Sequence, residues 1–248
     1  MSSIYNGNYI ATTYKEPASD YPKKLARHLL WQRGYLWKKG PMIPDGGEVL
    51  DMGCGNGDIT LAMQKCGYDA YGIDIGTVAK DRLPKGRFKQ VDLQTQQYPF
   101  HDNTFDVVFS KSVVEHLHHP DHLINEAKRV LRPGGVIITM TPSWKHSNKE
   151  AFYIDHTHVT PFIKHSLSVL HELSGFENVN TEYFYQLPEL WDGSESSWYM
   201  KPVSRAVQFL GLPYRPFSDV SWSDKMNKFI RFSQEAMLLC VATKPTKL

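Results

Sequence analysis

The chain has 248 residues, which is enough for one large α/β domain and rather short for two. Its 28 basic and 26 acidic residues give a formal net charge of +2, so no large charge excess favours nucleic acid or an anionic membrane as a partner. Three cysteines, at positions 54, 66 and 240, have neither disulfide-like nor metal-like spacing, which favours a reducing compartment. The first residues lack the pattern of a signal peptide and no stretch is apolar for the length of a membrane span, so we expect a soluble cytoplasmic protein without membrane insertion.

The first 44 residues are expected to form an N-terminal arm followed by a cap helix. Apolar residues at positions 25, 29, 30, 36 and 37 predict a helix over roughly residues 23–38, and a link rich in proline and glycine follows it. Tyr5, Tyr9 and Tyr14 lie ahead of that helix. We expect the arm to cover the functional site, with these tyrosines as candidate lid residues.

A glycine-rich turn after the first strand is the most informative feature of the sequence. Residues Val49 to Met52 suit a buried strand, and glycines at 53, 55 and 57 let the backbone turn tightly and approach a ligand. A helix begins after Gly57, and the free N–H groups at a helix start attract a carboxylate or a phosphate. The spacing is G-x-G-x-G after Asp51, whereas dinucleotide-binding folds prefer G-x-G-x-x-G. Alone, this turn predicts a nucleotide-like ligand, with a plain strand-to-helix connection as the alternative.

The ends of the next three strands also carry acidic or small residues. A second strand ends at Asp74, 23 positions after Asp51, and an acid at such an offset commonly holds ribose hydroxyls. The third strand ends at Asp92 and Leu93, and the fourth ends at Ser110. Strands and helices alternate to about residue 141, which predicts a parallel sheet wound on both faces.

The remaining elements complete the predicted sheet and enclose an insertion. In chain order we predict a helix over residues 123–131 stopped by a Pro-Gly-Gly sequence, a strand over 136–141, a helix over 162–174, a strand over 179–185 and a last strand over 236–243. Residues 187–232, between the last two strands, contain Trp191, Trp198 and Trp222. Aromatic residues at this density fit either the lining of a substrate pocket or the core of a small subdomain.

Five ordered motifs resemble those of the class I S-adenosylmethionine-dependent methyltransferases. They are VLDMGCGNG, YGIDIG, VDLQ, FDVVFSKSVVEHL and EAKRVLRPGGVIIT, and they are similar to those of the small-molecule branch that includes the ubiquinone and menaquinone biosynthesis enzymes. The resemblance covers roughly residues 45–185. It implies a Rossmann-like, doubly wound α/β fold with a seven-stranded sheet, mostly parallel with an antiparallel last strand. The core would comprise residues 45–186 and 233–248.

The same resemblance implies S-adenosylmethionine as cofactor and S-adenosylhomocysteine as product. The methionyl part would lie over the glycine turn, the ribose on Asp74 and the adenine beside Asp92 and Leu93. Ser110 and Lys111 would lie at the edge that faces the acceptor. The implied cofactor-binding residues are Asp51, Gly53, Cys54, Gly55, Asn56, Gly57, Asp74, Ile75, Asp92, Leu93, Ser110 and Lys111. Cys54 is expected to be a small packing residue rather than a nucleophile.

Two histidine-rich stretches supply candidate catalytic groups. His116 follows Glu115 in the family pattern and is expected either to line the acceptor side of the site or to pack at a helix end. In the second stretch Asp155 precedes His156 and His158, and an acid beside a histidine can orient its ring and raise its basicity. His116, His156 and His158 are therefore candidate catalytic residues. Either of the last two would be the proton acceptor, with a structural role in the loop as the alternative.

The sequence does not predict a metal site. His118, His119 and His122 flank a turn at Pro120, where exposure to solvent is expected. Asp155 with His156 and His158 could instead hold a divalent metal that polarises an acceptor diol, and this stays an alternative to a catalytic base.

The function predicted from these features is methyl transfer from S-adenosylmethionine to a small-molecule acceptor, with a hydroxyl of a sugar, glycan or natural-product-like scaffold as the favoured target. The alternatives are a catalytically silent protein that binds the cofactor to scaffold a partner and a nicotinamide-dependent oxidoreductase, which the GCGNG spacing disfavours. Nucleic acid is disfavoured as a partner by the charge balance, and the oligomeric state is left open.

Overall fold

The computed structural model describes residues 20–31, 45–147, 150–191, 194, 197–214 and 222–246. The predicted arm with Tyr5, Tyr9 and Tyr14 lies outside these residues, as do residues 32–44 of the predicted cap helix and link. No helix within the described ranges combines the length and the apolar character that crossing a membrane requires.

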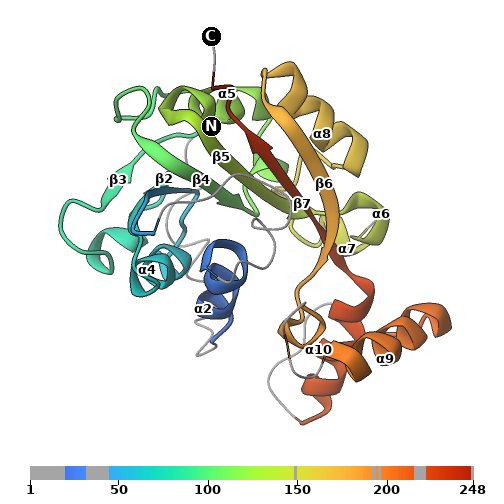
Figure 1. Cartoon of the computed structure of the whole chain (residues 1–248). Helices are drawn as coiled ribbons and strands as arrows, with labels where there is room; N and C mark the ends of the chain where they lie inside the picture. Colours follow the sequence, from blue (N-terminus) through green and yellow to red (C-terminus); the bar gives the residue numbers. More distant parts are fainter. Residues whose placement is uncertain are drawn as a thin grey trace.

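A seven-stranded sheet with the order β3-β2-β1-β4-β5-β7-β6 forms the centre of the molecule (Figure 1). All neighbouring strands pair in parallel except β7, which is antiparallel to both β5 and β6. This arrangement confirms the predicted mostly parallel sheet with an antiparallel last strand. The strands are β1 Glu48–Met52, β2 Asp69–Asp74, β3 Phe88–Gln90, β4 Phe105–Lys111, β5 Leu131–Pro142, β6 Glu177–Tyr185 and β7 Ala236–Thr243.

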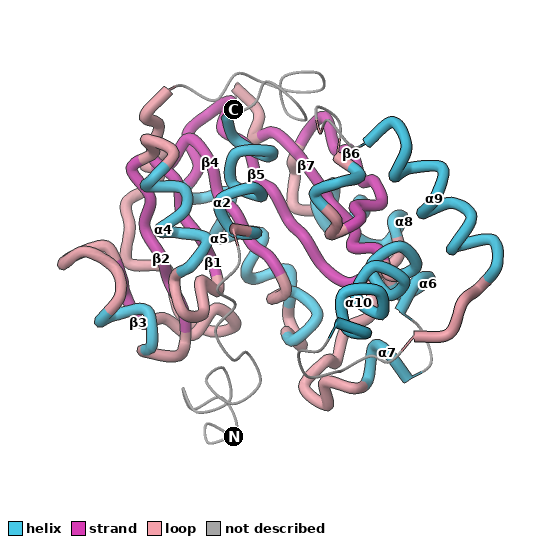
Figure 2. Tube along the Cα trace, turned by 90° about the horizontal axis from the view of Figure 1, so that it is seen from below, coloured by secondary structure: helices cyan, strands magenta, loops and turns pink. Residues whose placement is uncertain are grey.

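Helices cover both faces of the sheet, as Figures 1 and 2 show from two directions. The helices nearest the strands are α2 Tyr21–Ala26, α4 Asp58–Lys65, α5 Pro120–Val130 and α8 Lys164–Leu173. The short elements are the π-helix η1 Arg27–Trp31, the 3₁₀ helices η2 Val78–Asp81, η3 Val114–His116 and η4 Pro188–Leu190, and the helical turns α6 Trp144–Ser147 and α7 Glu150–Tyr153. The last two helices are α9 Ser197–Leu210 and α10 Trp222–Gln234.

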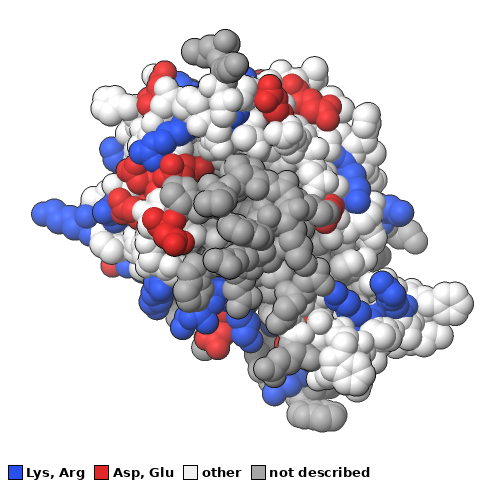
Figure 3. Space-filling model, viewed as in Figure 1, with Lys and Arg blue, Asp and Glu red and all other residues white. Residues whose placement is uncertain are grey.

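Side chains along the central strands point alternately to the two faces of the sheet, so each face has its own core. Leu50 and Met52 of β1 belong to the buried cluster that includes α5 and α8, whereas Val49 belongs to the cluster that includes α2 and α4. Because both faces are covered, the central strands are nearly continuous apolar runs rather than alternating ones. The surface seen in Figure 3 carries both charge signs interspersed over its described part, which fits the formal net charge of +2.

Among the several element boundaries that differ from the predicted ones, the starts of α5 and β5 differ most. Helix α5 begins at Pro120 rather than at residue 123, because proline at the first helical position loses no hydrogen bond. Strand β5 begins at Leu131 rather than at residue 136, so the Pro-Gly-Gly sequence lies inside the strand. The pairing of β4 with β5 is irregular between Phe105 and Val107, and the extra residues of β5 are accommodated there.

Between β6 and β7 the chain forms helices α9 and α10, which pack against each other beyond the ends of these strands (Figure 1). Trp191 belongs to the main core: its ring stacks on His28 at 4.7 Å between centroids, and its Nε1–H donates to the Tyr185 carbonyl at 2.8 Å. By contrast, Trp198 and Phe209 of α9 are 77% and 91% exposed. Of these three aromatic residues, Trp191 therefore belongs to the core and Trp198 and Phe209 belong to the surface.

A buried histidine joins α8 to the sheet. His171 is fully buried, and its Nδ1 bonds the Leu167 carbonyl at 2.8 Å, which assigns the hydrogen to Nδ1. Its Nε2 therefore accepts the hydroxyl hydrogen of Thr139 on β5, at 2.9 Å. Burial lowers the pKa of His171 to about 4, so the ring is neutral in the folded protein at pH 7.

This histidine predicts an acid-sensitive contribution to stability. Its folded pKa of about 4 lies below the unfolded value of about 6.5, so the unfolded chain binds the extra proton between these values and stability falls as the pH falls through them. Between about pH 7 and about pH 5 we expect His171 to remove about 2 kcal/mol from the free energy of unfolding. Urea denaturation at both pH values measures the free energy of unfolding. Between pH 7 and pH 5 it should fall by about 2 kcal/mol more in the wild type than in His171→Gln. Equal pH dependence in both proteins would contradict the assignment.

Candidate active site

The glycine turn connects β1 to α4 with a backbone that only glycine adopts readily. Gly53, Gly55 and Gly57 have φ values of +73°, +56° and +83°, and Gly57 is the N-cap of α4. The N–H groups of Gly53 and Cys54 both donate to the Ile73 carbonyl of β2, at 2.8 and 3.1 Å. The turn is thereby fixed beside the end of the neighbouring strand.

The two ends of this turn face different surroundings. A Cβ on Gly53 would lie 2.2 Å from Val113 Cγ2, whereas a Cβ on Gly55 would have nothing within 4 Å. Cys54 packs against Ala79 and Leu83, and a Cβ on Gly72 would lie 2.7 Å from its sulfur. Burial raises the pKa of the Cys54 thiol strongly, so the residue is a packing group and not a thiolate nucleophile.

Asp74 at the end of β2 holds the turn from the other side. Its Oδ2 accepts the N–H of Gly55 at 2.9 Å, and its Oδ1 accepts the N–H of Gly76 at 2.7 Å. Burial raises the pKa of Asp74, and these backbone hydrogen bonds oppose that shift. Each carboxylate oxygen can accept further hydrogen bonds, so Asp74 can also receive hydroxyl groups from a ligand.

Asp51, one strand away on β1, is also buried, with 2% exposure. Its Oδ2 accepts the hydroxyl hydrogen of Thr60 on α4 at 2.7 Å. Burial raises the pKa of Asp51 to about 7, against the effect of this hydrogen bond, and the charge of Asp74 raises it further. Two buried carboxylates therefore flank the glycine turn, an arrangement that a positively charged ligand would stabilise.

The residues after β2 and β3 differ in their exposure. Asp92 directs both carboxylate oxygens into its own turn, accepting from the Gln94 N–H and the Thr95 hydroxyl at 2.9 Å each. Leu93 is buried, whereas Ile75, which follows Asp74, is 37% exposed. The apolar side chain of Ile75 is thus available to a flat ligand group next to Asp74.

Ser110 and Lys111 end β4 beside the turn. The Ser110 hydroxyl is buried and has no hydrogen-bond partner among the described residues. Burial lowers the pKa of Lys111, while the charges of Glu115 and Asp51 act to raise it. The next residue, Ser112, has a φ of +57°, which marks the sharp bend that leads the chain toward η3.

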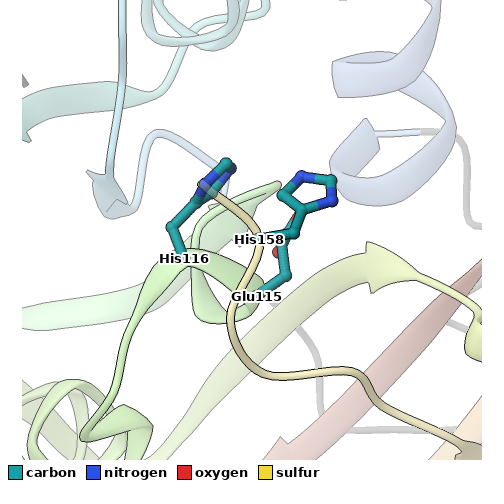
Figure 4. Close-up of side chains that lie close together, drawn as sticks. All are labelled: Glu115, His116 and His158. Atoms are coloured by element: carbon teal, nitrogen blue, oxygen red, sulfur yellow. The ribbon is translucent and has the colours of Figure 1, made fainter. Parts of the chain in front are cut away.

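Glu115, His116 and His158 come together from two segments of the chain, as Figure 4 shows. Glu115 and His116 belong to η3, and His158 lies between α7 and α8. The Glu115 carbonyl accepts the N–H groups of Val159 and Thr160, at 2.8 and 3.0 Å, and so joins the two segments. One ligand-type atom from each of the three side chains lies within 4.8 Å of the others, so this group could hold a metal ion.

Hydrogen bonds around the two histidines fix their orientation. His116 Nδ1 lies 2.8 Å from Thr157 Oγ1, whose hydroxyl donates to Asp155 Oδ1 at 2.6 Å. His158 Nδ1 bonds the Phe152 carbonyl at 2.7 Å. Burial lowers the pKa of both rings, to about 4 for His116, where neighbouring His158 adds to the effect. Both imidazoles are therefore neutral at pH 7.

The structure separates the three histidines that the sequence grouped as catalytic candidates. His116 and His158 lie with their ring centroids 4.6 Å apart, whereas His156 is exposed and is not part of their group. Sequence reasoning placed Glu115 in a motif but missed it as a site residue. Its complete burial and a pKa raised by burial to about 7 distinguish it, and neither property can be read from the sequence.

Comparison with known proteins identifies the family. A model described as "Methyltransferase domain" matches residues 21–181. The chain belongs to this methyltransferase family. It is a class I S-adenosylmethionine-dependent methyltransferase, as the five motifs predicted. The sheet order agrees with that assignment.

The relatives of this methyltransferase are distant. The demethylmenaquinone methyltransferase of Anoxybacillus flavithermus is 23% identical over 223 residues, which cover 81% of this chain and 93% of that protein. Among solved structures, an S-adenosylmethionine-dependent methyltransferase from Archaeoglobus fulgidus aligns with a TM-score of 0.61 and 20% identity, covering 96% of this chain and 99% of the other. Phosphoethanolamine N-methyltransferase 2 of Haemonchus contortus was solved with phosphomonomethylethanolamine and S-adenosylhomocysteine. It aligns with a TM-score of 0.58 and 19% identity, covering 96% of this chain and 59% of the other. At these identities the solved structures support the fold.

The glycine turn predicts a difference between two matched substitutions. Gly53→Ala should lower the free energy of unfolding by about 2–5 kcal/mol, because its Cβ would overlap Val113 and also sit in a left-handed conformation. Gly55→Ala should lower it by only about 1–2 kcal/mol, since only the backbone conformation is unfavourable there. Urea denaturation of the two variants measures both values. Equal losses would show that the contact with Val113 does not limit residue 53.

Proposed function

We propose that this methyltransferase transfers a methyl group to a hydroxyl of a small-molecule acceptor, such as a sugar, a glycan or a natural-product-like scaffold. The observation that carries the proposal is the group formed by Glu115, His116 and His158, which presents atoms that accept hydrogen bonds. A hydroxyl must lose its proton as its oxygen attacks, so such a group has a use in oxygen methylation. That the relative from Anoxybacillus flavithermus is a demethylmenaquinone methyltransferase supports a small-molecule acceptor.

We propose that the cofactor lies along the ends of β1, β2 and β4. The open space beside Gly55 fits the close approach of the methionyl part, and Asp51 and Asp74 offer negative charge to its cationic groups. Asp74 would also receive the ribose hydroxyls, with Ile75, Asp92 and Leu93 beside the adenine and Ser110 and Lys111 at the edge nearest the acceptor. Cys54, Asn56 and Gly57 complete the predicted set through the backbone of the turn. When bound, S-adenosylmethionine supplies an electrophilic methyl group on a positively charged sulfur.

The protein contributes mainly by positioning the cofactor and the acceptor relative to each other. Orienting two reactants well is worth about 7–11 kcal/mol of the barrier, and a positioned base adds roughly 3–5 kcal/mol. His116 Nε2 and His158 Nε2 are the atoms suited to receive the hydroxyl proton, because the Nδ1 atom of each ring is committed to Thr157 or Phe152. The neutral state of both rings keeps these nitrogens available at pH 7.

Aromatic side chains beside His158 support an acceptor with a ring. Phe152 lies 4.6 Å from the His158 ring and 5.3 Å from Trp144, measured between centroids. Tyr153 packs edge-on against both Phe152 and Trp144 and is 53% exposed. Phe152 is itself buried, so the exposed ring of Tyr153 is the face that would pack against the apolar side of a sugar or a scaffold ring. We also propose residues 187–232 as an acceptor-side element, as their place between β6 and β7 first indicated.

The cofactor assignment predicts the effect of removing Asp74. Asp74→Ala should weaken binding of S-adenosylhomocysteine by at least tenfold, because the acceptor for two ribose hydroxyls and the support of the Gly55 amide are lost together. Isothermal titration calorimetry measures this affinity. Asp58→Ala is the control, because Asp58, at the start of α4, pairs with Arg82 instead. Unchanged affinity in Asp74→Ala would contradict the assignment.

The three histidines predict a graded effect on turnover. His116→Ala and His158→Ala should each lower kcat by 10²–10⁴-fold with the affinity for S-adenosylhomocysteine nearly unchanged, whereas His156→Ala should change kcat little because its side chain is exposed. Transfer of a labelled methyl group to a panel of sugars and phenols provides the assay. Wild-type rates in the first two variants would contradict their role. Saturable cofactor binding without transfer to any member of the panel would favour the silent-scaffold alternative.

A further inference from the structure

We propose that Glu115, His116 and His158 bind one divalent transition-metal ion, of the kind that zinc represents. The donor atoms would be Glu115 Oε1, His116 Nε2 and His158 Nε2. One ligand-type atom of each side chain lies within 4.8 Å of the others, and the two imidazoles and the carboxylate lie close together in Figure 4. Ligands at about 2.0–2.2 Å from a zinc ion lie no more than about 4.4 Å apart, so small side-chain rotations suffice.

The hydrogen-bond directions show which ring nitrogens are free to donate an electron pair. The Thr157 hydroxyl hydrogen goes to Asp155 Oδ1, so Thr157 Oγ1 must accept from His116 Nδ1–H. The Phe152 carbonyl can only accept, so His158 also carries its hydrogen on Nδ1. In both neutral rings Nε2 is therefore an electron-pair donor without a hydrogen. His158 Nε2 lies 3.9 Å from Asp155 Oδ2, which is beyond hydrogen-bond distance, and within the described part of the chain no hydrogen bond to His116 Nε2 is found.

Glu115 brings a third electron-pair donor to the same place. Its side chain is completely buried, and its Oε2 accepts the Thr141 hydroxyl at 2.8 Å. Its Oε1 is buried without any hydrogen-bond partner among the residues described. Lys111 acts on Glu115 through space only, since no ion pair within 4.0 Å joins them in the described structure. The three side chains thus bring potential donor atoms together, and a bound cation would compensate the buried Glu115 carboxylate.

The set of donors selects the kind of ion. Two imidazole nitrogens with one carboxylate oxygen suit zinc and its first-row neighbours, whereas magnesium prefers oxygen donors alone. Three protein ligands also leave a coordination position open. Each histidine donates its other N–H to an oxygen, the arrangement that orients metal-binding histidines in proteins. Asp155, which accepts from Thr157, extends this support for His116 one step further.

The ion would act on the acceptor hydroxyl, and this step rests on the proposed function. The hydroxyl oxygen would take the open coordination position, and coordination lowers its pKa so that its proton passes to water. An oxygen lone pair then forms the new bond to the methyl carbon as the carbon–sulfur bond breaks and its electron pair stays on sulfur. Atoms and electrons balance without an oxidant or a reductant. With the ion bound, the two Nε2 atoms hold it and do not take the proton.

Metal titration of the whole protein tests the inference independently of any acceptor. After dialysis against EDTA, Co²⁺ should produce the visible absorption of a low-symmetry site, saturating near one ion per chain, and Zn²⁺ but not Mg²⁺ should abolish it. Glu115→Gln and His158→Ala should each weaken Co²⁺ uptake by at least tenfold. His156→Ala and His118→Ala should not, because both histidines are exposed. Binding of S-adenosylhomocysteine by each variant shows that it is folded.

The outcomes separate this inference from the proposed function. Absence of a saturable Co²⁺ spectrum, or uptake that is unchanged in Glu115→Gln and His158→Ala, would overturn the metal site. Full methyl transfer to a hydroxyl acceptor in the presence of EDTA would also overturn it while leaving the proposed function intact. Stoichiometric Co²⁺ binding that depends on Glu115 and His158 would support the site even if no hydroxyl acceptor were methylated.

Discussion

The contact between Gly53 and Val113 is the constraint on which the site depends. A side chain at residue 53 would lie 2.2 Å from Val113 Cγ2, so the turn after β1 and the segment after β4 fit together only because residue 53 has none. Gly53 lies two residues before Gly55, and Val113 lies two residues before Glu115. The contact therefore joins the turn proposed for the cofactor to the segment proposed for the acceptor. A displacement that needs two reactants in line depends on such a rigid connection.

Three buried carboxylates give this region its electrostatic character. Burial raises the pKa values of Asp51, Asp74 and Glu115, and the hydrogen bonds from Thr60, the Gly55 and Gly76 amides and Thr141 oppose these shifts only in part. Burying anionic groups without full compensation destabilises a fold, and perturbed groups of this kind gather at functional sites. Positive charge supplied by ligands removes the imbalance. The positively charged sulfur of the cofactor would do so near Asp51 and Asp74, and the proposed ion would do so at Glu115.

Much of the fold and part of the site could be predicted from the sequence because their signals are local. The glycines, the acid at residue 74 and the apolar strands lie within short segments whose geometry follows from the residues themselves. The histidine group is different, because residues 115 and 116 meet residue 158 through contacts between distant segments, among them the hydrogen bonds that the Glu115 carbonyl accepts and the bond between His116 and Thr157. His156 and His158 look equivalent in the sequence, and only burial and the Phe152 carbonyl distinguish them. Trp191 likewise gives no local sign that it belongs to the main core.

The choice of acceptor follows from what each kind of nucleophile requires. A neutral amine can attack a methyl group before it loses a proton, so a group of electron-pair donors offers it little help. A hydroxyl oxygen becomes a good nucleophile only as its proton leaves, and in the proposed function Glu115, His116 and His158 would provide for that loss with or without a bound ion. The family match ends at residue 181, so α9 and α10 lie beyond it. We therefore expect the histidine group to determine the atom that is methylated, and the aromatic residues around His158 together with residues 187–232 to determine the molecule that carries it.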